Sequence, residues 1–233
     1  MQNHNPSNRV KEEKEEEADD DDDDQAVKEW SSIQQVSFYL NKAANLPQRT
    51  EGEAILFGLI PKDVKRVIDL GTGDGHLLKL LKRQIPYIKA VAVDVSPIML
   101  DAARKYFAND PDVEVIEHNL SNSLPDMGQF DAVISSFVIH HLAHERKRSL
   151  YQEIYDILNS GGIFCNLEHV ASVSQKQHIH FFNAIGHSIE TEDKSDKLLS
   201  MEGQLNWLKE IGFVDVDCYW KWLEMALLVG YKT

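Results

Sequence analysis

This 233-residue chain has few of the residues that mark secreted or membrane-spanning proteins. Its only two cysteines, Cys165 and Cys218, lie in apolar stretches typical of strands, so we expect packed free thiols rather than a disulfide. No segment approaches the roughly 18 uninterrupted apolar residues of a membrane span. The N-terminus lacks the basic start and apolar run of a secretory signal. We therefore expect a cytoplasmic protein with no membrane partner.

Basic residues are also scarce, because 24 Lys and Arg face 38 Asp and Glu, a net charge of −14. Residues 1–29 hold twelve acidic and four basic residues, net −8, which leaves −6 for the rest. A phosphate-binding surface is normally basic, so the charge argues against a nucleic acid partner but not against a protein acceptor. The tight basic cluster at 144–148 is expected to be a solvated helix face.

The acidic residues divide the chain into a tail and one domain. Residues 1–28 include a run of six aspartates with almost no apolar neighbours, which predicts a disordered tail. Such a tail is a solubilising extension or a docking arm for a basic partner. Residues 29–233 are long and apolar enough to form one buried core.

Apolar strand patterns alternate with amphipathic helix patterns along this domain, without an internal repeat. This order predicts an α/β fold, a mostly parallel sheet with helices on both faces. A short turn near 221–224 makes the last two strands antiparallel, because it is too short for a crossover. Residues 171–199 break the pattern with a polar, His-rich stretch, which we interpret as an insertion or lid. The predicted helices are 29–45, 51–60, 75–85, 97–108, 144–158 and 201–210, and the strands are 65–70, 89–94, 112–117, 130–136, 161–168, 213–220 and 225–231.

The most informative stretch is 67–76, an apolar run that ends in Asp69 and then has glycines at 71, 73 and 75. Glycine is needed where the backbone takes positive φ or approaches a ligand closely, and the following helix offers free N–H groups. A dinucleotide loop would have its third glycine at the sixth position, where this chain has His76. That departure disfavours a nicotinamide oxidoreductase.

The loop resembles motif I of the class I S-adenosylmethionine-dependent methyltransferases, and the resemblance continues in order through residues 65–231. It implies a Rossmann-like, seven-stranded sheet with an antiparallel last strand, and S-adenosyl-L-methionine as cofactor. Asp94 matches the acid that binds the ribose hydroxyls. Asn119 stands where the family usually has an acid that contacts the adenine amino group. Its side-chain carbonyl can still accept a hydrogen bond from that amino group. The cofactor-binding residues so implied are Asp69, Gly71, Thr72, Gly73, Gly75, Asp94, Val95, Asn119, Leu120 and Ser136.

Methyl transfer to a hydroxyl or amine requires removal of a proton, for which histidine is well suited near neutral pH. His140 and His141 follow the fourth strand at the carboxyl edge of the sheet, although adjacent residues do not easily point into one pocket. They are candidate bases or a structural pair at a helix entry. Glu168 ends the fifth strand at the same edge and is a second catalytic candidate. Its neighbour His169, with Tyr39 and Arg49, is a candidate substrate contact, and no metal site is predicted.

The acceptor is expected to be a small molecule. Residues 136–142, the leading aromatic helix and the C-terminal hairpin resemble a small-molecule branch that includes trans-aconitate methyltransferase-like and carboxy-S-adenosylmethionine synthase-like proteins. RNA- or protein-directed methyl transfer, a carboxy-S-adenosylmethionine-type reaction and a non-catalytic cofactor-binding module remain alternatives. The sequence predicts no oligomeric state.

Overall fold

The structure is a computed structural model that describes residue 32 and residues 46–233. The predicted acidic tail over 1–28, the helix predicted over 29–45 and the candidate Tyr39 lie outside the described residues.

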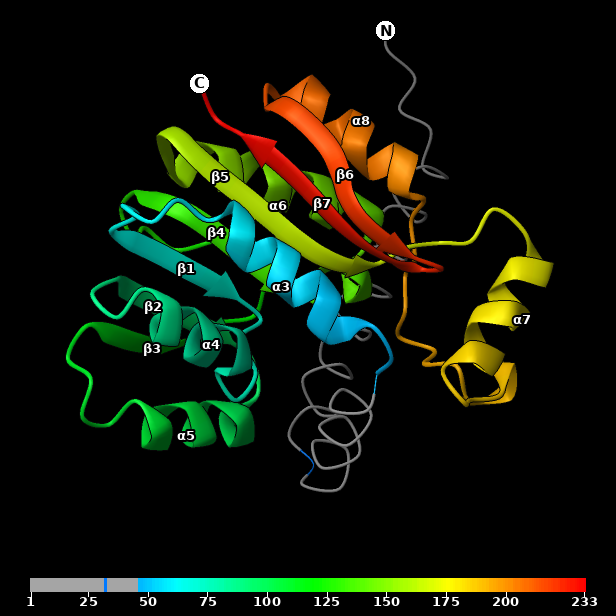
Figure 1. Cartoon of the computed structure of the whole chain (residues 1–233), viewed down its shortest axis with the longest axis horizontal. Coiled ribbons are helices and arrows are strands. Elements are labelled where there is room, and N and C mark those ends of the chain that lie inside the picture. The colour runs from blue at the N-terminus through cyan, green and yellow to red at the C-terminus, as the bar shows by residue number, and fades with distance from the viewer. Residues whose placement is uncertain (1–31, 33–45) are drawn as a thin grey trace, which may run out of the picture.

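Helices and strands alternate through the described part of the chain, as the sequence pattern predicts (Figure 1). In chain order they are α3 (Arg49–Leu59), β1 (Arg66–Leu70), α4 (His76–Gln84), β2 (Lys89–Asp94), α5 (Pro97–Tyr106), β3 (Val113–Glu117), β4 (Phe130–Ser136), η1 (Ile139–His141), α6 (His144–Ile157), β5 (Leu158–His169), α7 (Gln175–Ala184), η2 (Ile189–Thr191), α8 (Met201–Ile211), β6 (Val214–Trp222) and β7 (Met225–Tyr231).

The strands form one seven-stranded sheet in the order β3-β2-β1-β4-β5-β7-β6. Strands β1 to β5 are parallel, and β7 runs antiparallel between β5 and β6. The order reverses between β1 and β4, which is where open α/β sheets bind their ligands. The predicted fold class is confirmed.

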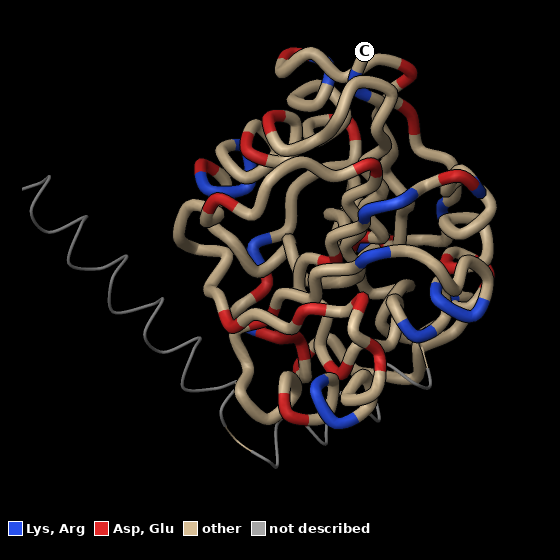
Figure 2. The backbone as a smooth tube through the Cα atoms, turned by 90° about the vertical axis from the view of Figure 1, so that its left-hand side faces the viewer, with Lys and Arg blue, Asp and Glu red and all other residues tan. Residues whose placement is uncertain are grey.

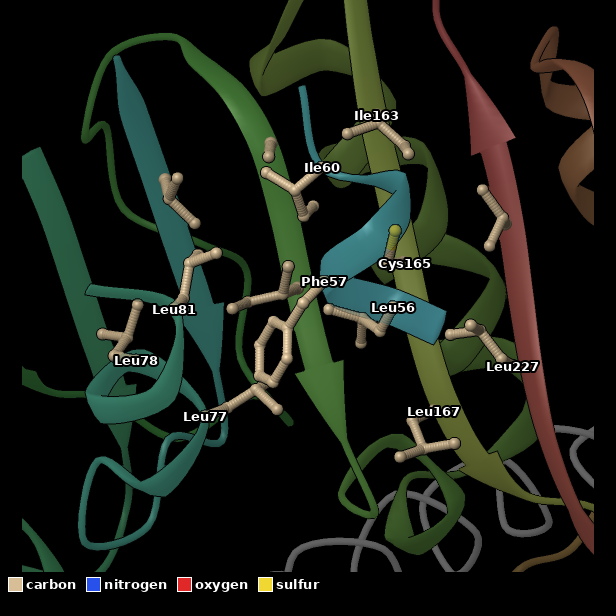
Figure 3. Packing of buried hydrophobic residues seen from close by; sticks show 14 of the residues in the cluster. Leu56, Phe57, Ile60, Leu77, Leu78, Leu81, Ile163, Cys165, Leu167 and Leu227 are labelled. Atoms are coloured by element: carbon tan, nitrogen blue, oxygen red, sulfur yellow. The ribbon is translucent and has the colours of Figure 1, made fainter. Parts of the chain in front are cut away.

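Two apolar cores cover the two faces of the sheet, because the inner strands bury side chains on both sides. On one face Leu56 and Phe57 of α3, with the following Ile60, pack with three leucines of α4 against Cys165 and Leu167 (Figure 3). On the other face α6 and α8 pack against β1, β4 and β5 through Tyr151, Ile154 and Leu208. Cys165 is fully buried and Cys218 half-buried, and both are free thiols, as predicted.

The fold departs from the prediction at the start of β5. This strand begins at Leu158, directly after α6, whereas the predicted strand begins at 161. Gly161, at φ 79°, lets the strand start irregularly, and the pairing with β4 shifts register between Phe130 and Ala132. The region 171–199 contains α7 and η2, and Figure 1 shows α7 projecting beyond the edge of the sheet.

Within the described residues, no helix combines the length and apolar character that a membrane crossing requires.

Candidate active site

The glycine loop leaves β1 with all three of its glycines at positive φ: 73° at Gly71, 56° at Gly73 and 86° at Gly75. A Cβ on Gly71 would lie 2.2 Å from the Val138 side chain, and one on Gly75 would lie 2.7 Å from Phe107. These two glycines are therefore required by packing. Among the described residues, nothing lies within 4 Å of where a Cβ on Gly73 would be, so on this side the middle glycine faces space where a ligand can approach the backbone.

Two carboxylates hold this loop. Asp94 accepts from the backbone N–H of Gly73 through Oδ2 (2.7 Å) and from that of Ser96 through Oδ1 (2.9 Å). Burial raises the pKa of Asp94. The hydrogen bonds from the Gly73 and Ser96 N–H groups, and a further one from the Val95 N–H, lower it by less, so the net shift is upward. Asp69 is buried and accepts from Thr72 Oγ1 at 2.7 Å, and burial raises its pKa to about 7. The acids thus order the loop that would surround the cofactor.

The loop after β3 is anchored by an arginine that the sequence placed on a solvated face. Arg146 donates to the Leu120 carbonyl (2.7 Å), to the Asn122 carbonyl (2.9 Å) and to both carboxylate oxygens of Glu153. Asn119 Oδ1 accepts from the Ser121 N–H at 2.9 Å, and Leu120 is buried. Asn119 and Leu120 therefore sit in a fixed turn.

The prediction of a solvated 144–148 face is wrong for its centre. Lys147 is 1% exposed and donates to the Lys197 carbonyl, and burial lowers its pKa to about 8. Only the outer members of the cluster, such as Arg148, are exposed. Among the coloured residues in the view of Figure 2, Lys and Arg alternate with Asp and Glu and do not form one stripe.

Two buried polar atoms at the same sheet edge have no hydrogen-bond partner within the described part of the chain: Ser136 Oγ at the end of β4 and His118 Nε2 after β3. Phe137, directly after Ser136, has φ 54°, a left-handed conformation that is strained for this residue. Buried polar atoms normally find partners, so these two are free to meet a bound molecule. With the open space at Gly73, they fit the adenosyl cofactor that the loop implies.

Arg49 lies in α3 over the same edge of the sheet. Its Nε donates to Glu53 Oε1 at 2.7 Å, and its guanidinium lies 5.7 Å from the centroid of the Phe137 ring. Glu53 also contacts His76 Nε2 at 3.1 Å. Burial raises the pKa of Glu53, but these two partners outweigh it and the net shift is downward. Arg49 is therefore already engaged with a carboxylate of its own chain.

The candidate catalytic residues come together. His140 Nδ1 lies 2.7 Å from Glu168 Oε1, and Glu168 also accepts from the side chain of Asn166 (3.2 Å) and the N–H of His169 (2.9 Å). The His140 and His141 rings are tilted with centroids 4.1 Å apart. The sequence-based expectation that adjacent histidines diverge is wrong here, because η1 turns residues 139–141 into a 3-10 helix rather than a strand.

One residue that the sequence analysis did not select joins this group. Asp196, from the 171–199 segment, lies 3.5 Å from His140 Nε2, 3.3 Å from His141 Nδ1 and 3.5 Å from His169 Nδ1. Asp196 thus brings the 171–199 segment to the sheet edge that carries His140, His141 and His169. No periodic pattern marks Asp196, so only the fold could reveal it.

His169 is held from its other side by Glu224, whose Oε2 lies 2.9 Å from His169 Nε2. Burial lowers the His169 pKa, but Asp196 and Glu224 outweigh it and raise it to about 9. Burial and the charge of His140 lower the His141 pKa to about 4. His169 is thus a protonated ion-pair partner at neutral pH, whereas His141 is neutral.

Glu168 is fully buried, and burial alone would raise its pKa. The charge and hydrogen bond of His140 outweigh burial, so the Glu168 pKa is lowered and the group stays ionised. Because its oxygens are occupied by His140, Asn166 and the backbone, Glu168 orients His140 rather than meeting a substrate.

Comparisons with known proteins agree with this geometry. Residues 67–162 match the methyltransferase domain family. An uncharacterized methyltransferase of Mycobacterium tuberculosis is 36% identical over 110 residues, which cover 47% of this chain and 53% of that protein. A carboxy-S-adenosyl-L-methionine synthase of Campylobacter lari is 25% identical over 214 residues, 85% of this chain and 88% of that one. Human N-acetylserotonin methyltransferase in complex with S-adenosylmethionine shares the fold (TM-score 0.59, 19% identity, 79% of this chain, 52% of that one).

The glycine loop and its two acids lie within the stretch that matches a methyltransferase domain, and the sheet has the fold of the solved methyltransferases. The chain spans about half the length, 53%, of the mycobacterial relative that it matches.

Proposed function

We propose that this protein transfers the methyl group of S-adenosylmethionine to a hydroxyl or amine of a small-molecule acceptor. The observation that carries the proposal is the buried His140–Glu168 pair, 2.7 Å apart, four residues beyond the unpartnered Ser136 at the end of β4. An imidazole oriented by a carboxylate thus stands at the edge that would hold the cofactor.

In this proposal Asp94 and the glycine loop bind the ribose and methionine parts, and Asn119, Leu120 and Ser136 line the adenine side. A sulfonium methyl is already activated, so alignment of nucleophile, methyl and sulfur can supply about 7 to 11 kcal/mol of barrier reduction. His140 or His141 removes the acceptor's proton, and Glu168 positions His140. A small acceptor fits a site that the segment around Asp196 partly covers.

The test is a screen of metabolite extracts with an isotope-labelled methyl donor. A labelled product that forms with the wild type and not with Asp94→Ala would support the proposal. Calorimetric titration of S-adenosylmethionine and of NAD distinguishes the cofactor classes. Saturable binding of NAD without binding of S-adenosylmethionine would overturn the proposal.

A second candidate is a carboxy-S-adenosylmethionine-type reaction. It is favoured by the length of the match to the Campylobacter lari synthase, which covers 85% of this chain, against 47% for the mycobacterial methyltransferase. Mass spectrometry of the nucleotide after turnover separates the two, since methyl transfer leaves S-adenosylhomocysteine and this alternative leaves a carboxylated sulfonium.

A further inference from the structure

The carboxylate of Asp196 faces three imidazole nitrogens at distances too long for ordinary charge-assisted hydrogen bonds. The separations are 3.5 Å to His140 Nε2, 3.3 Å to His141 Nδ1 and 3.5 Å to His169 Nδ1. Charge-assisted N–H···O bonds are about 2.7 to 2.9 Å long. Other histidine–carboxylate pairs of this protein have that length, namely His140–Glu168 at 2.7 Å and His169–Glu224 at 2.9 Å.

The longer separations match the spacing of ligand atoms around a metal ion. In a tetrahedral zinc site with bonds of about 2.0 to 2.1 Å, neighbouring ligand atoms are about 3.4 Å apart. The ligand atoms of His140, His141 and Asp196 all lie within 4.8 Å of one another. We propose that His140, His141 and Asp196 form a binding site for a divalent transition-metal ion of the zinc type, although the sequence analysis predicted no metal.

The partners behind these residues are those that a metal-binding histidine requires. Glu168 Oε1 lies 2.7 Å from Nδ1 of His140, so the other ring nitrogen, Nε2, faces Asp196. A carboxylate behind a ligating histidine fixes its tautomer and raises its basicity. Glu168 is itself held by Asn166 and by the His169 N–H.

His141 Nδ1 has a competing contact. Ser195 Oγ lies 3.0 Å from His141 Nδ1 and 2.8 Å from Asp193 Oδ1. Metal binding requires His141 to give up the serine, which keeps its bond to Asp193. His141 and Asp196 side chains are 20% and 9% exposed, so an ion can enter from the His141 side.

Two imidazoles and one carboxylate with a further position open are the ligand set of catalytic rather than structural metal sites. The catalytic role of this metal site rests on the proposed function, whereas the binding of an ion does not. With an ion bound, His140 and His141 would be its ligands and would not act as the base; the ion would instead coordinate the acceptor's hydroxyl and lower its pKa. The O–H proton would leave to solvent, the oxygen would bond to the methyl carbon, and the carbon–sulfur bond would break to release S-adenosylhomocysteine.

The experiment uses the full chain, stripped with a chelator and titrated with Zn²⁺ by calorimetry and with Co²⁺ by visible absorption. We expect one equivalent of ion and, for Co²⁺, the intense absorption bands of a low-coordinate site. Asp196→Asn and His141→Ala should each weaken binding at least 100-fold, and Glu168→Gln about 10- to 100-fold. The control His180→Ala removes an exposed histidine of the same segment and should bind as the wild type does.

Two results would overturn the site: no saturable binding by the wild type, or equal affinity in Asp196→Asn and the wild type. Because Asp196→Asn can loosen its segment, His141→Ala tests the same ion from a separate element, and circular dichroism checks both folds. S-Adenosylmethionine binding is measured separately. Absence of metal binding by the wild type, with normal cofactor binding, refutes the metal site alone, and absence of methyl transfer by the wild type, with normal metal binding, refutes the proposed function alone.

Discussion

Gly73 donates its backbone N–H to the Asp94 carboxylate over 2.7 Å, although 21 residues separate them in the chain. This bond joins the loop after β1 to the end of β2, so the conformation of the loop depends on a side chain that would also bind the cofactor.

Asp94→Ala should weaken cofactor binding strongly while the protein still folds. The substitution removes the ribose contact and the bonds to the Gly73 and Ser96 N–H groups, each worth about 1.5 to 3 kcal/mol for a charged acceptor. Calorimetry should show a dissociation constant for S-adenosylmethionine that is at least 100-fold higher than that of the wild type. The control Asp101→Ala removes a carboxylate that is 79% exposed and should bind normally.

Substitutions of the loop glycines should affect different properties of the protein. Gly73→Val should fold with a modest loss from its positive φ, about 1 to 2 kcal/mol, and lose cofactor binding because the new side chain occupies the ligand's space. Gly71→Ala should be less stable, because its Cβ would lie 2.2 Å from Val138. Thermal melts and cofactor titration separate the two, and normal binding by a folded Gly73→Val would contradict the assignment of that space.

Asp69 should make stability depend on pH. Its pKa is raised to about 7 by burial, so the folded state holds a proton that the unfolded state releases near pH 4. The free energy of unfolding is unaffected by this shift below pH 4. It then falls as the pH rises to about 7, by at most about 4 kcal/mol in total. In cofactor-free protein, Asp69→Asn should therefore be more stable than the wild type at pH 8 and similar at pH 4. Parallel denaturation profiles across this range would refute the shift.

Arg146→Ala should destabilise the protein and weaken cofactor binding, because Arg146 ties the turn at 119–122 to α6. We expect a loss of about 2 kcal/mol and a fall in Tm of roughly 4 to 8 °C. The neighbouring Arg148→Ala is the matched control, since its ion pair with Glu210 is about half-exposed and worth at most about 1 kcal/mol. Equal losses in both variants would show that the turn does not depend on Arg146.

His140→Ala should leave cofactor affinity within about twofold and lower turnover roughly 10²- to 10⁴-fold, the usual contribution of a positioned base. Methyl transfer from labelled cofactor is the measurement, with His180→Ala as control. Unchanged turnover in His140→Ala would exclude His140 from the reaction.

Most of the fold was predictable because burial imposes periodicity. The apolar runs of β1, β2 and β4 and the start of the helix predicted over 97–108 could be recognised locally, and the structure confirms them. The start of β5 was mistaken because the Asn-Ser-Gly-Gly stretch indicates a turn, whereas pairing with β4 draws these residues into the sheet. Local propensity is overridden there by long-range hydrogen bonding.

By itself the sequence determined the fold class, the glycine loop and its two acids, because these rest on residues close together in the chain and on the order of the strands. Tertiary structure alone decided the environment of the catalytic edge. Asp196 is 55 residues from His141, and Glu53 is 23 residues from His76, yet each pair is in contact. Such contacts leave no mark on local pattern, since they arise only when the sheet brings the ends of separate strands and the following segments to one edge.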